Sequence, residues 1–253
     1  MKILALDTST NACSVALLEG KQEDFSTIER FEIAPRQHTQ LILPMLDAVL
    51  QEAGYQINDI DSLAFGCGPG AFTGVRIATG VIQAIAYGAD VPVAQISSLA
   101  AIAQGVYQHT ILAHESTHWA EKILVASDAR MAEIYFAAYE IEQGFMTLKG
   151  NECVIKPELL QQTLSQYEFI DQLWSMIGNG WSVYQPQLHT LAASCHTLSY
   201  ADELMEQLSY PQAKNIAYLA FKEIAEGKLL AAAQVSPVYL RNNVAKKPKN
   251  LYK

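Results

Sequence analysis

The chain has 253 residues, half of them hydrophobic and 17% charged, which suits one large or two small globular domains and excludes a disordered protein. Its net charge of −9 argues against a protein that coats nucleic acid by itself. The four cysteines are scattered, and neither a signal peptide nor a membrane span is expected, so we predict a cytoplasmic protein with reduced thiols.

A short unit occurs twice along the chain. In each copy a buried strand ends in an aspartate, a turn follows, and a second apolar strand comes next: residues 2–7 with 13–18, and residues 122–128 with 133–141. Actin-like ATPase folds use such a unit once in each lobe. We therefore predict an α/β protein with the actin-like (ASKHA, RNase H-like) fold, with lobes at residues 1–110 and 111–253. A chance likeness of two short units is the alternative.

Helical and strand patterns fill the rest of the chain. In the first lobe we predict helices at 37–53, 72–88 and 97–107, and short strands at 61–65 and 92–94. A polar, histidine-rich connection at 108–121 leads to the second lobe. There we predict strands at 122–128, 132–141, 145–155 and either 169–171 or 174–178, and helices at 157–165, 201–208 and 215–226. A late helix of this lobe could pack back on the first.

The predicted helix at 72–88 is apolar on more than one face. One face carries Gly74, Ala78, Val81 and Ile85, a second carries Val75, Ile82 and Ala86, and a row of small residues, Gly80, Ala84 and Gly88, forms a third. A helix on one side of a sheet needs a single apolar stripe, so the excess predicts a subunit interface shared with the helix at 37–53. The alternative is a helix covered entirely by its own fold. The residues assigned to this interface are Leu41, Met45, Gly74, Arg76, Ala78, Val81 and Ile85.

A glycine-rich corner from Gly66 to Arg76 precedes and opens this helix. Glycine permits a tight turn there, or the close approach of another backbone, a phosphate or a helix. The free N–H groups at the start of a helix can also face an anion. The stretch matches neither the dinucleotide fingerprint nor a P-loop, in which a lysine follows the last glycine.

The same corner carries a family signature. Gly68-Pro69-Gly70-x-Phe72-Thr73-Gly74-x-Arg76 resembles the motif of the bacterial TsaB (YeaZ) family, non-catalytic relatives of the tRNA threonylcarbamoyladenosine synthase TsaD. The likeness extends to residues 3–8, 35–40 with 43–44, 127–131 and 237–245. Several separate motifs in the right order make chance agreement unexpected.

The resemblance implies a partner subunit of a tRNA-modifying complex. Such a chain pairs with TsaD as a heterodimer and supports transfer of threonylcarbamoyl to the adenosine 3′ of the anticodon in ANN-decoding tRNAs. The ATPase TsaE joins through the TsaB–TsaD pair, and tRNA is contacted indirectly. Alone, the chain is expected to form a homodimer through the same helices, because a bare apolar surface favours association. No membrane contact and no cofactor are implied.

Two histidines, His114 and His118, form a His-Glu-x-x-His run that on a long helix would hold zinc in a metallopeptidase. The run lies in the polar connection, without a convincing third ligand, so we reject it as a metal site and keep a metallopeptidase only as an alternative function. In TsaD the resemblance implies two metal-binding histidines four residues apart. The matching positions here are Ser98 and Ile102, and isoleucine cannot ligate a metal.

Nucleotide binding has weak candidates in Asp7, Thr8 and Ser9, which follow the first strand. Actin-like ATPases have a glycine in this turn, and its absence here weakens the case, although hydroxyls can bind phosphate. A free-standing kinase or ATPase of the same fold is therefore a second alternative. Near the C-terminus, Arg241 and a lysine-rich tail could hold the tail to the body or contact tRNA, and the sequence does not choose between them.

Overall fold

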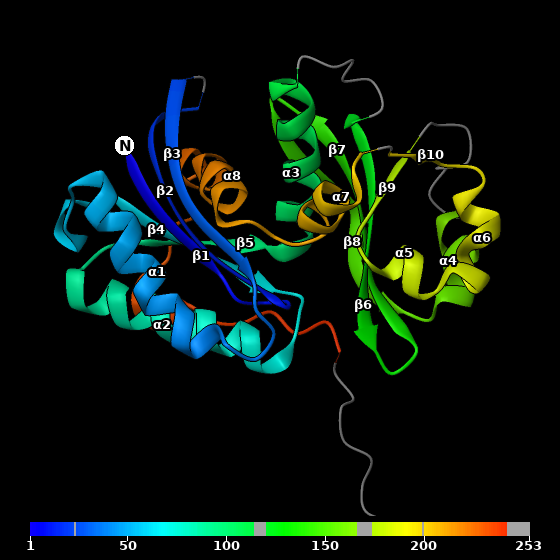
Figure 1. Ribbon diagram of the computed structural model, residues 1–253, viewed down its shortest axis with the longest axis horizontal. Coiled ribbons are helices and arrows are strands. Elements are labelled where there is room, and N and C mark those ends of the chain that lie inside the picture. Colours follow the sequence, from blue (N-terminus) through cyan, green and yellow to red (C-terminus); the bar gives the residue numbers. More distant parts are fainter. Residues whose placement is uncertain (23, 114–119, 166–173, 199, 242–253) are drawn as a thin grey trace, which may run out of the picture.

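The structure, a computed structural model, describes residues 1–22, 24–113, 120–165, 174–198 and 200–241. Within these residues the strands form two five-stranded sheets that stand next to each other with helices around them (Figure 1). The first sheet contains β1 (Lys2–Asp7), β2 (Ala12–Lys21), β3 (Asp24–Ile33), β4 (Ser62–Gly68) and β5 (Val93–Ser97). The second contains β6 (Lys122–Arg130), β7 (Glu133–Glu142), β8 (Phe145–Ile155), β9 (Ser175–Ile177) and β10 (His196–Thr197).

The two sheets have the same topology. The order in the first is β3-β2-β1-β4-β5, and reading the second from its β8 edge gives β8-β7-β6-β9-β10. In both sheets the first three strands along the chain pair antiparallel. The fourth strand then pairs parallel with the first, and the fifth pairs parallel with the fourth. The short unit that occurs twice in the sequence thus forms the first two strands of each sheet. The predicted actin-like α/β fold is confirmed.

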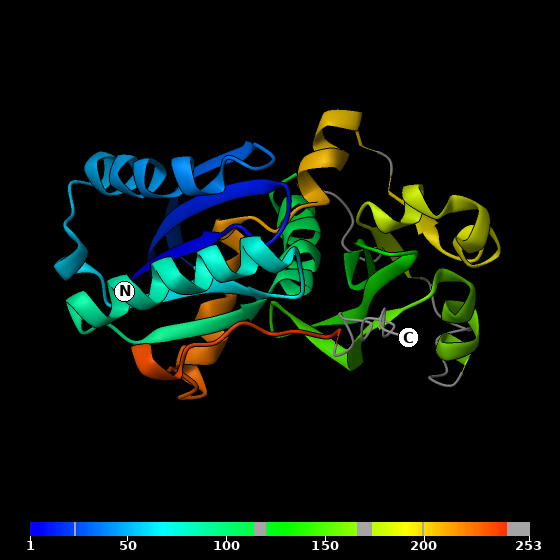
Figure 2. The ribbon, with the colours of Figure 1, turned by 90° about the horizontal axis from the view of Figure 1, so that it is seen from below.

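Helices cover both faces of the first sheet. α1 (His38–Ala53) and α2 (Phe72–Ala89) pack on one face, where side chains such as Leu4, Leu17 and Phe65 are buried beneath them. α8 (Ala213–Ala225) packs on the other face, although it belongs to the last part of the chain (Figure 2). Apolar side chains of α8 and of β1, β2, β4 and β5 form one continuous core there.

One helix lies between the two sheets. α3 (Ser98–Leu112) follows β5 and presents Leu99, Ile102 and Val106 to the second sheet, while Ala101 packs with α8. α7 (Asp202–Leu208) adds Leu208 to the same core. The outer face of the second sheet is covered by α4 (Pro157–Ser165), α5 (Gly180–Val183) and α6 (Gln185–Ala192). Among the described helices, none combines the length and hydropathy that a membrane span requires.

Some element predictions were wrong. β3 was not predicted, because this edge strand has no fully buried residue and its apolar positions do not alternate cleanly. α3 extends to Leu112, into the stretch predicted as a connection, and α6 was missed. Of the two alternatives for a short strand, the structure has 175–177, whereas 169–171 lies outside the described residues.

The burial of α2 shows which of its faces are used inside the chain. Gly74 and Ala78 are buried on the sheet, together with the second predicted apolar face. Gly74 and Ala78 therefore cannot form an outer surface, and their assignment to a subunit interface needs correction. The face of α2 that packs on the sheet is wide enough to include residues from both of the predicted apolar faces. Val81 and Ile85 are half-buried, and so are Leu41 and Met45 on α1. The row of small residues, Gly80, Ala84 and Gly88, is exposed, together with Tyr87 and the first turn of α2.

Two glycines of α2 provide a matched test of this packing. A Cβ at Gly74 would collide with the backbone carbonyl oxygen of Thr8, whereas one at Gly80 would meet no atom within 4 Å. We expect Gly74→Ala to lower the free energy of unfolding by about 2–3 kcal/mol. Gly80→Ala should raise it by about 0.5–1 kcal/mol, since alanine favours an exposed helix interior. Chemical denaturation of both variants checks this, and equal effects would contradict the assigned faces.

Candidate functional site

The corner between β1 and β2 packs directly on the glycine-rich loop before α2. The Thr8 hydroxyl donates to the Gly74 carbonyl at 2.7 Å, and the Ala71 N–H donates to the Ser9 carbonyl at the same distance. A Cβ at Gly70 or Gly74 would collide with the Ser9 or Thr8 carbonyl oxygen. The glycines are therefore required by the approach of another backbone, which was one of the uses that the sequence left open.

Asp7, at the centre of this corner, is completely buried. Its Oδ1 accepts hydrogen bonds from the Ser9 N–H at 2.9 Å and the Ser9 hydroxyl at 3.0 Å, while Oδ2 has no hydrogen-bond partner among the described residues. Burial raises the pKa of Asp7 from 3.8 to about 7, and the two bonds from Ser9 oppose that rise. Asp7 and Thr8 are thus engaged within the corner itself, and of the three nucleotide candidates Ser9 alone lines the neighbouring cleft.

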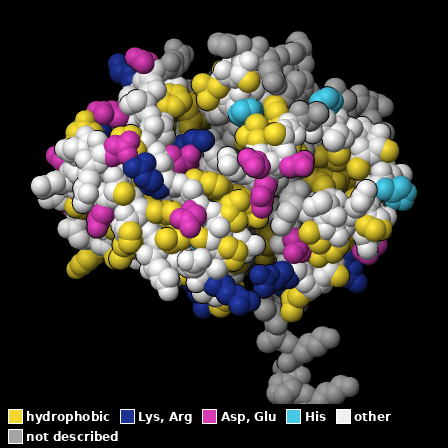
Figure 3. Space-filling view, in the orientation of Figure 1, with side chains coloured by type: hydrophobic (Ala, Val, Ile, Leu, Met, Phe, Trp, Pro, Cys, Tyr) yellow, Lys and Arg dark blue, Asp and Glu magenta, His cyan; other side chains and the backbone are white. Residues whose placement is uncertain are grey.

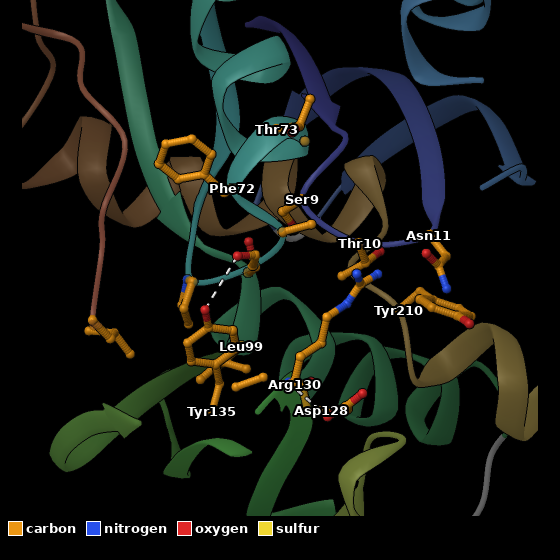
Figure 4. A pocket seen from close by; sticks show the side chains of 18 of the residues that line it. Ser9, Thr10, Asn11, Phe72, Thr73, Leu99, Asp128, Arg130, Tyr135 and Tyr210 are labelled. Atoms are coloured by element: carbon orange, nitrogen blue, oxygen red, sulfur yellow. Dashed lines mark hydrogen bonds between the residues drawn. The ribbon is translucent and has the colours of Figure 1, made fainter. Parts of the chain in front are cut away.

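A cleft of about 710 Å³ lies between the lobes. The first lobe lines it with the β1–β2 corner, the glycine loop and the start of α1, and the second lobe with the β6–β7 turn and Asn179. Figure 4 shows Arg130 directed from the second lobe toward Thr10 and Asn11 of the first. On the same side, the Tyr135 hydroxyl donates to the Gly70 carbonyl at 3.4 Å and so joins the two walls.

The second repeat ends in Asp128, which is only half-buried and lines the cleft. Its Oδ1 accepts from the Arg130 N–H at 2.8 Å and the Tyr184 hydroxyl at 2.9 Å, and its own N–H donates to Asn179 Oδ1 at 2.9 Å. Arg130 and the two residues that follow have φ values of 60°, 57° and 58°. Three successive non-glycine residues thus occupy the left-handed region in the turn that carries Arg130, which lines the cleft.

The segment at 230–241, which we call the strap, connects the two lobes, and its residues 238–241 line the cleft. Its Val238 N–H donates to the Cys67 carbonyl at 2.8 Å, and its Tyr239 hydroxyl accepts from Arg76 Nε at 2.7 Å. In the second lobe, Arg241 Nε donates to the Glu133 carboxylate at 2.9 Å. Arg241 therefore joins the strap to the second lobe, and Arg76, assigned to an interface from the sequence, is in contact with the strap.

Two pairs of positions were considered as metal ligands from the sequence: the histidines of the His-Glu-x-x-His run, which were rejected, and Ser98 with Ile102. His114 and His118 lie outside the described residues. Ser98 and Ile102 are buried on α3, and the isoleucine side chain has no ligand atom, so this pair does not fit the metal site that TsaD resemblance implies. In the part of the chain that the structure describes, no three His, Cys, Asp or Glu side chains are grouped as metal ligands.

Comparison with known proteins agrees with the fold and the motifs. The family model for TsaD, tRNA N6-adenosine threonylcarbamoyltransferase, matches residues 31–249. The tRNA threonylcarbamoyladenosine biosynthesis protein TsaB of Escherichia coli (strain K12) is 40% identical over 246 residues, 97% of this chain and 96% of that protein. The chain belongs to the TsaB family.

Other relatives extend the same match. TsaB of Haemophilus influenzae is 36% identical and is covered over 95% of its length, with 96% of this chain aligned. Two structures from Pseudomonas aeruginosa are also similar: a protein with similarity to peptidase YeaZ has a TM-score of 0.78 at 38% identity, covering 95% of this chain and 99% of that one. The second structure, YeaZ, has a TM-score of 0.76 at 37% identity, and the match covers 94% of this chain and 99% of that one. The resemblance inferred from the motifs is confirmed.

Sequence reasoning named Asp7, Thr8 and Ser9 as weak nucleotide-binding candidates and did not identify the wall of the cleft that the second lobe supplies. Arg130 was noticed only as part of a family motif, and Thr10 and Asn11 were not considered. The repeat could have identified these residues. The residues after Asp7 and those after Asp128 occupy equivalent turns in the two sheets, so the two turns are expected to face each other between the lobes.

Because Asp7 is buried, the free energy of unfolding is expected to depend on pH. Between pH 3.8 and about 7 the folded chain keeps this proton and the unfolded chain loses it, so stability from this group falls as pH rises. Asp7→Asn keeps an acceptor for Ser9 and cannot ionise. We expect the unfolding free energy of Asp7→Asn, relative to the natural chain, to rise across this interval by on the order of 3 kcal/mol. Denaturant titrations at several pH values measure it; a constant difference would show that Asp7 is ionised when folded.

Proposed function

We propose that this TsaB-family chain is a non-catalytic subunit that binds a TsaD-type transferase. In that complex it supports transfer of threonylcarbamoyl to the adenosine 3′ of the anticodon in ANN-decoding tRNAs. The observation that carries the proposal is the outer side of α2 with the adjoining part of α1, where Leu43 and Tyr87 are exposed beside a row of small residues after these helices have covered their own sheet.

The docking surface, as we define it, combines the small row of α2 with the exposed and half-buried apolar side chains around it. On α2, nothing lies within 4 Å of a Cβ built at Gly80 or Gly88, so a second helix can approach the backbone closely. Tyr87 is 86% exposed beside this row, and Leu43 on α1 is 53% exposed. Next to α1, Leu41 and Met45 line a groove of about 270 Å³ against β3. A neighbouring protein chain could fill such a groove with apolar side chains.

The non-catalytic assignment has support from the residues that catalysis would need. Asp7 and Thr8 direct their polar atoms into the chain's own corner, with the Asp7 Oδ1 bonded to Ser9 and the Thr8 hydroxyl bonded to Gly74. Ile102, at a position that TsaD resemblance aligns with a metal-binding histidine, offers no ligand atom. These observations favour a chain that has kept the fold of a transferase and uses it for assembly.

The finer features of the assembly follow from the same proposal. TsaD would occupy the docking surface as a heterodimer, TsaE would join through that pair, and tRNA would be held by the complex and contacted indirectly. In the absence of TsaD, two copies of this chain would cover the surface as a homodimer. The chain would work in the cytoplasm, which the four free cysteines, Cys13, Cys67, Cys153 and Cys195, support.

Substitution in the small row tests the docking surface. Ala84→Arg places a long cation on an exposed position of α2, so the monomer should fold normally while the approach of a second helix is blocked. We expect loss of co-purification with TsaD and a shift of the isolated chain to monomer in size-exclusion chromatography with light scattering. The loss in affinity should be at least about 100-fold, as for a disrupted interface centre.

Leu159→Arg is the matched control, since Leu159 is 49% exposed on α4 of the other lobe. This variant should pair with TsaD like the natural chain. Thermal unfolding of both variants establishes that the fold is intact. Normal pairing by folded Ala84→Arg would exclude α2 as the docking helix.

A further inference from the structure

The strap begins in the core of the first lobe and ends on the surface of the second. Leu230 pairs with Val93 of β5 through two backbone hydrogen bonds of 2.8 and 2.9 Å, and Val235 is buried in the core beneath α1 and α2. None of the residues 236–241 is buried. Individual surface contacts therefore hold this last part of the strap, and a segment of that kind opens more easily than the elements it connects.

Two side chains of α2 hold the strap in the first lobe. Gln83 Nε2 donates to the Val235 carbonyl at 2.8 Å, and Arg76 Nε donates to the Tyr239 hydroxyl at 2.7 Å. The Arg76 guanidinium also lies 3.7 Å from the centroid of the Phe72 ring, and the Phe72 and Tyr239 rings are 5.6 Å apart. Phe72 is 54% and Tyr239 41% exposed, so this cluster is a surface contact, stabilised by a charge-assisted hydrogen bond and a cation–π interaction.

Arg76 also stands in line with the small row of the docking surface. Positions 76, 80, 84 and 88 follow one another at intervals of four residues, and all four are exposed. Residues four apart lie on the same side of a helix, and twelve residues of helix are about 18 Å long. A helix seated along the whole row would therefore reach Arg76 and cover its contact with Tyr239.

The other end of the strap is bonded to the β6–β7 turn. Arg241 Nε and Nη2 donate to Glu133 Oε2 at 2.9 and 2.5 Å. Arg241 Nη2 also donates to the carbonyl oxygens of Ala129 and Arg130, at 3.1 and 3.3 Å. One guanidinium group thus contacts the chain before and after the left-handed residues of the turn, and it stabilises the turn that carries Arg130.

The two anchors of the strap are too close in sequence to move independently. One residue separates Tyr239 from Arg241, and two residues of extended chain span at most about 7 Å. If Tyr239 leaves Arg76 by more than a few ångströms, Arg241 cannot keep its bonds to the turn. The strap crosses between the lobes at the lower edge of the molecule in Figure 1, where lysine and arginine side chains gather on the surface in Figure 3. Its contacts can open there without exposing a core.

We propose that residues 236–241 of the strap couple the outer side of α2 to the β6–β7 turn of the second lobe. The segment has two states. In one, Tyr239 is bonded to Arg76 and Arg241 to the turn; in the other, both bonds are released. A chain that covers Arg76 and Tyr239 favours the bonded state, and so holds the turn in place. This effect of a docked chain rests on the proposed function, whereas the link through the strap does not.

Hydrogen exchange of the full-length chain, followed by mass spectrometry, tests the link. All variants are made in the Ala84→Arg chain, so that no second copy covers α2. The reporter is the peptide that spans the β6–β7 turn, in which the Arg130 N–H is bonded to Asp128 Oδ1. Arg241→Gln should raise the exchange rate of this turn about 10-fold, the loss of a charge-assisted contact.

The decisive variants change the other end of the strap. Arg76→Gln and Tyr239→Phe should each raise the exchange rate of the same turn about 3-fold, although the bond that they remove lies in the first lobe. Tyr55→Phe is the matched control, because it removes a tyrosine hydroxyl that is bonded to Glu19, outside the strap. It should leave the turn unchanged, and thermal unfolding establishes that each variant is folded.

A second measurement adds TsaD to chains that keep Ala84. Binding should slow exchange of the β6–β7 turn in the natural chain and leave it unchanged in Tyr239→Phe. The coupling is overturned if Arg76→Gln and Tyr239→Phe exchange at the turn like their parent chain, or if bound TsaD leaves the natural turn unchanged. Failure of TsaD to bind would instead remove the proposed function, and the exchange of the isolated chains would still decide on the link.

Discussion

The rest of the structure depends on the contact between two stretches of backbone, the turn after β1 and the glycine loop before α2. Carbonyl oxygens of Thr8 and Ser9 occupy the space where side chains at Gly70 and Gly74 would be. This contact fixes where α2 begins, and hence which of its faces lies on the sheet and which is exposed. It also forms part of the cleft wall, so the same packing separates the proposed docking surface from the cleft between the lobes.

The two repeats have kept one topology while their aspartates have acquired different surroundings. Asp7 is sealed in the first lobe, where burial favours its neutral form. Asp128 is half-buried, bonded to Tyr184 and to the backbone of a left-handed turn, and it leaves Arg130 directed into the cleft. One copy has thus become a packing element and the other an open polar wall.

Much of the fold was predictable because the signals were local. Asp7 and Asp128 each end an apolar strand, and the motif from Gly68 to Arg76 is specific enough to indicate the family. What failed required knowledge of distant neighbours. Ala78 is apolar whether it faces its own sheet or a second chain, and only the packing of α2 decides between them. The partner of Arg241 lies more than a hundred residues away, and no pattern in the tail identifies it.

The position of α8 has a consequence for synthesis of the protein. One face of the first sheet is covered by residues 213–225, so Ile3, Ala5 and Leu18 find their cover only after nearly the whole chain has left the ribosome. Until then the strands made first present an apolar surface, and a fragment that ends after α3 would keep it permanently. A nascent chain therefore exposes this apolar face over most of its translation, and a premature stop codon should yield aggregation in place of a working half.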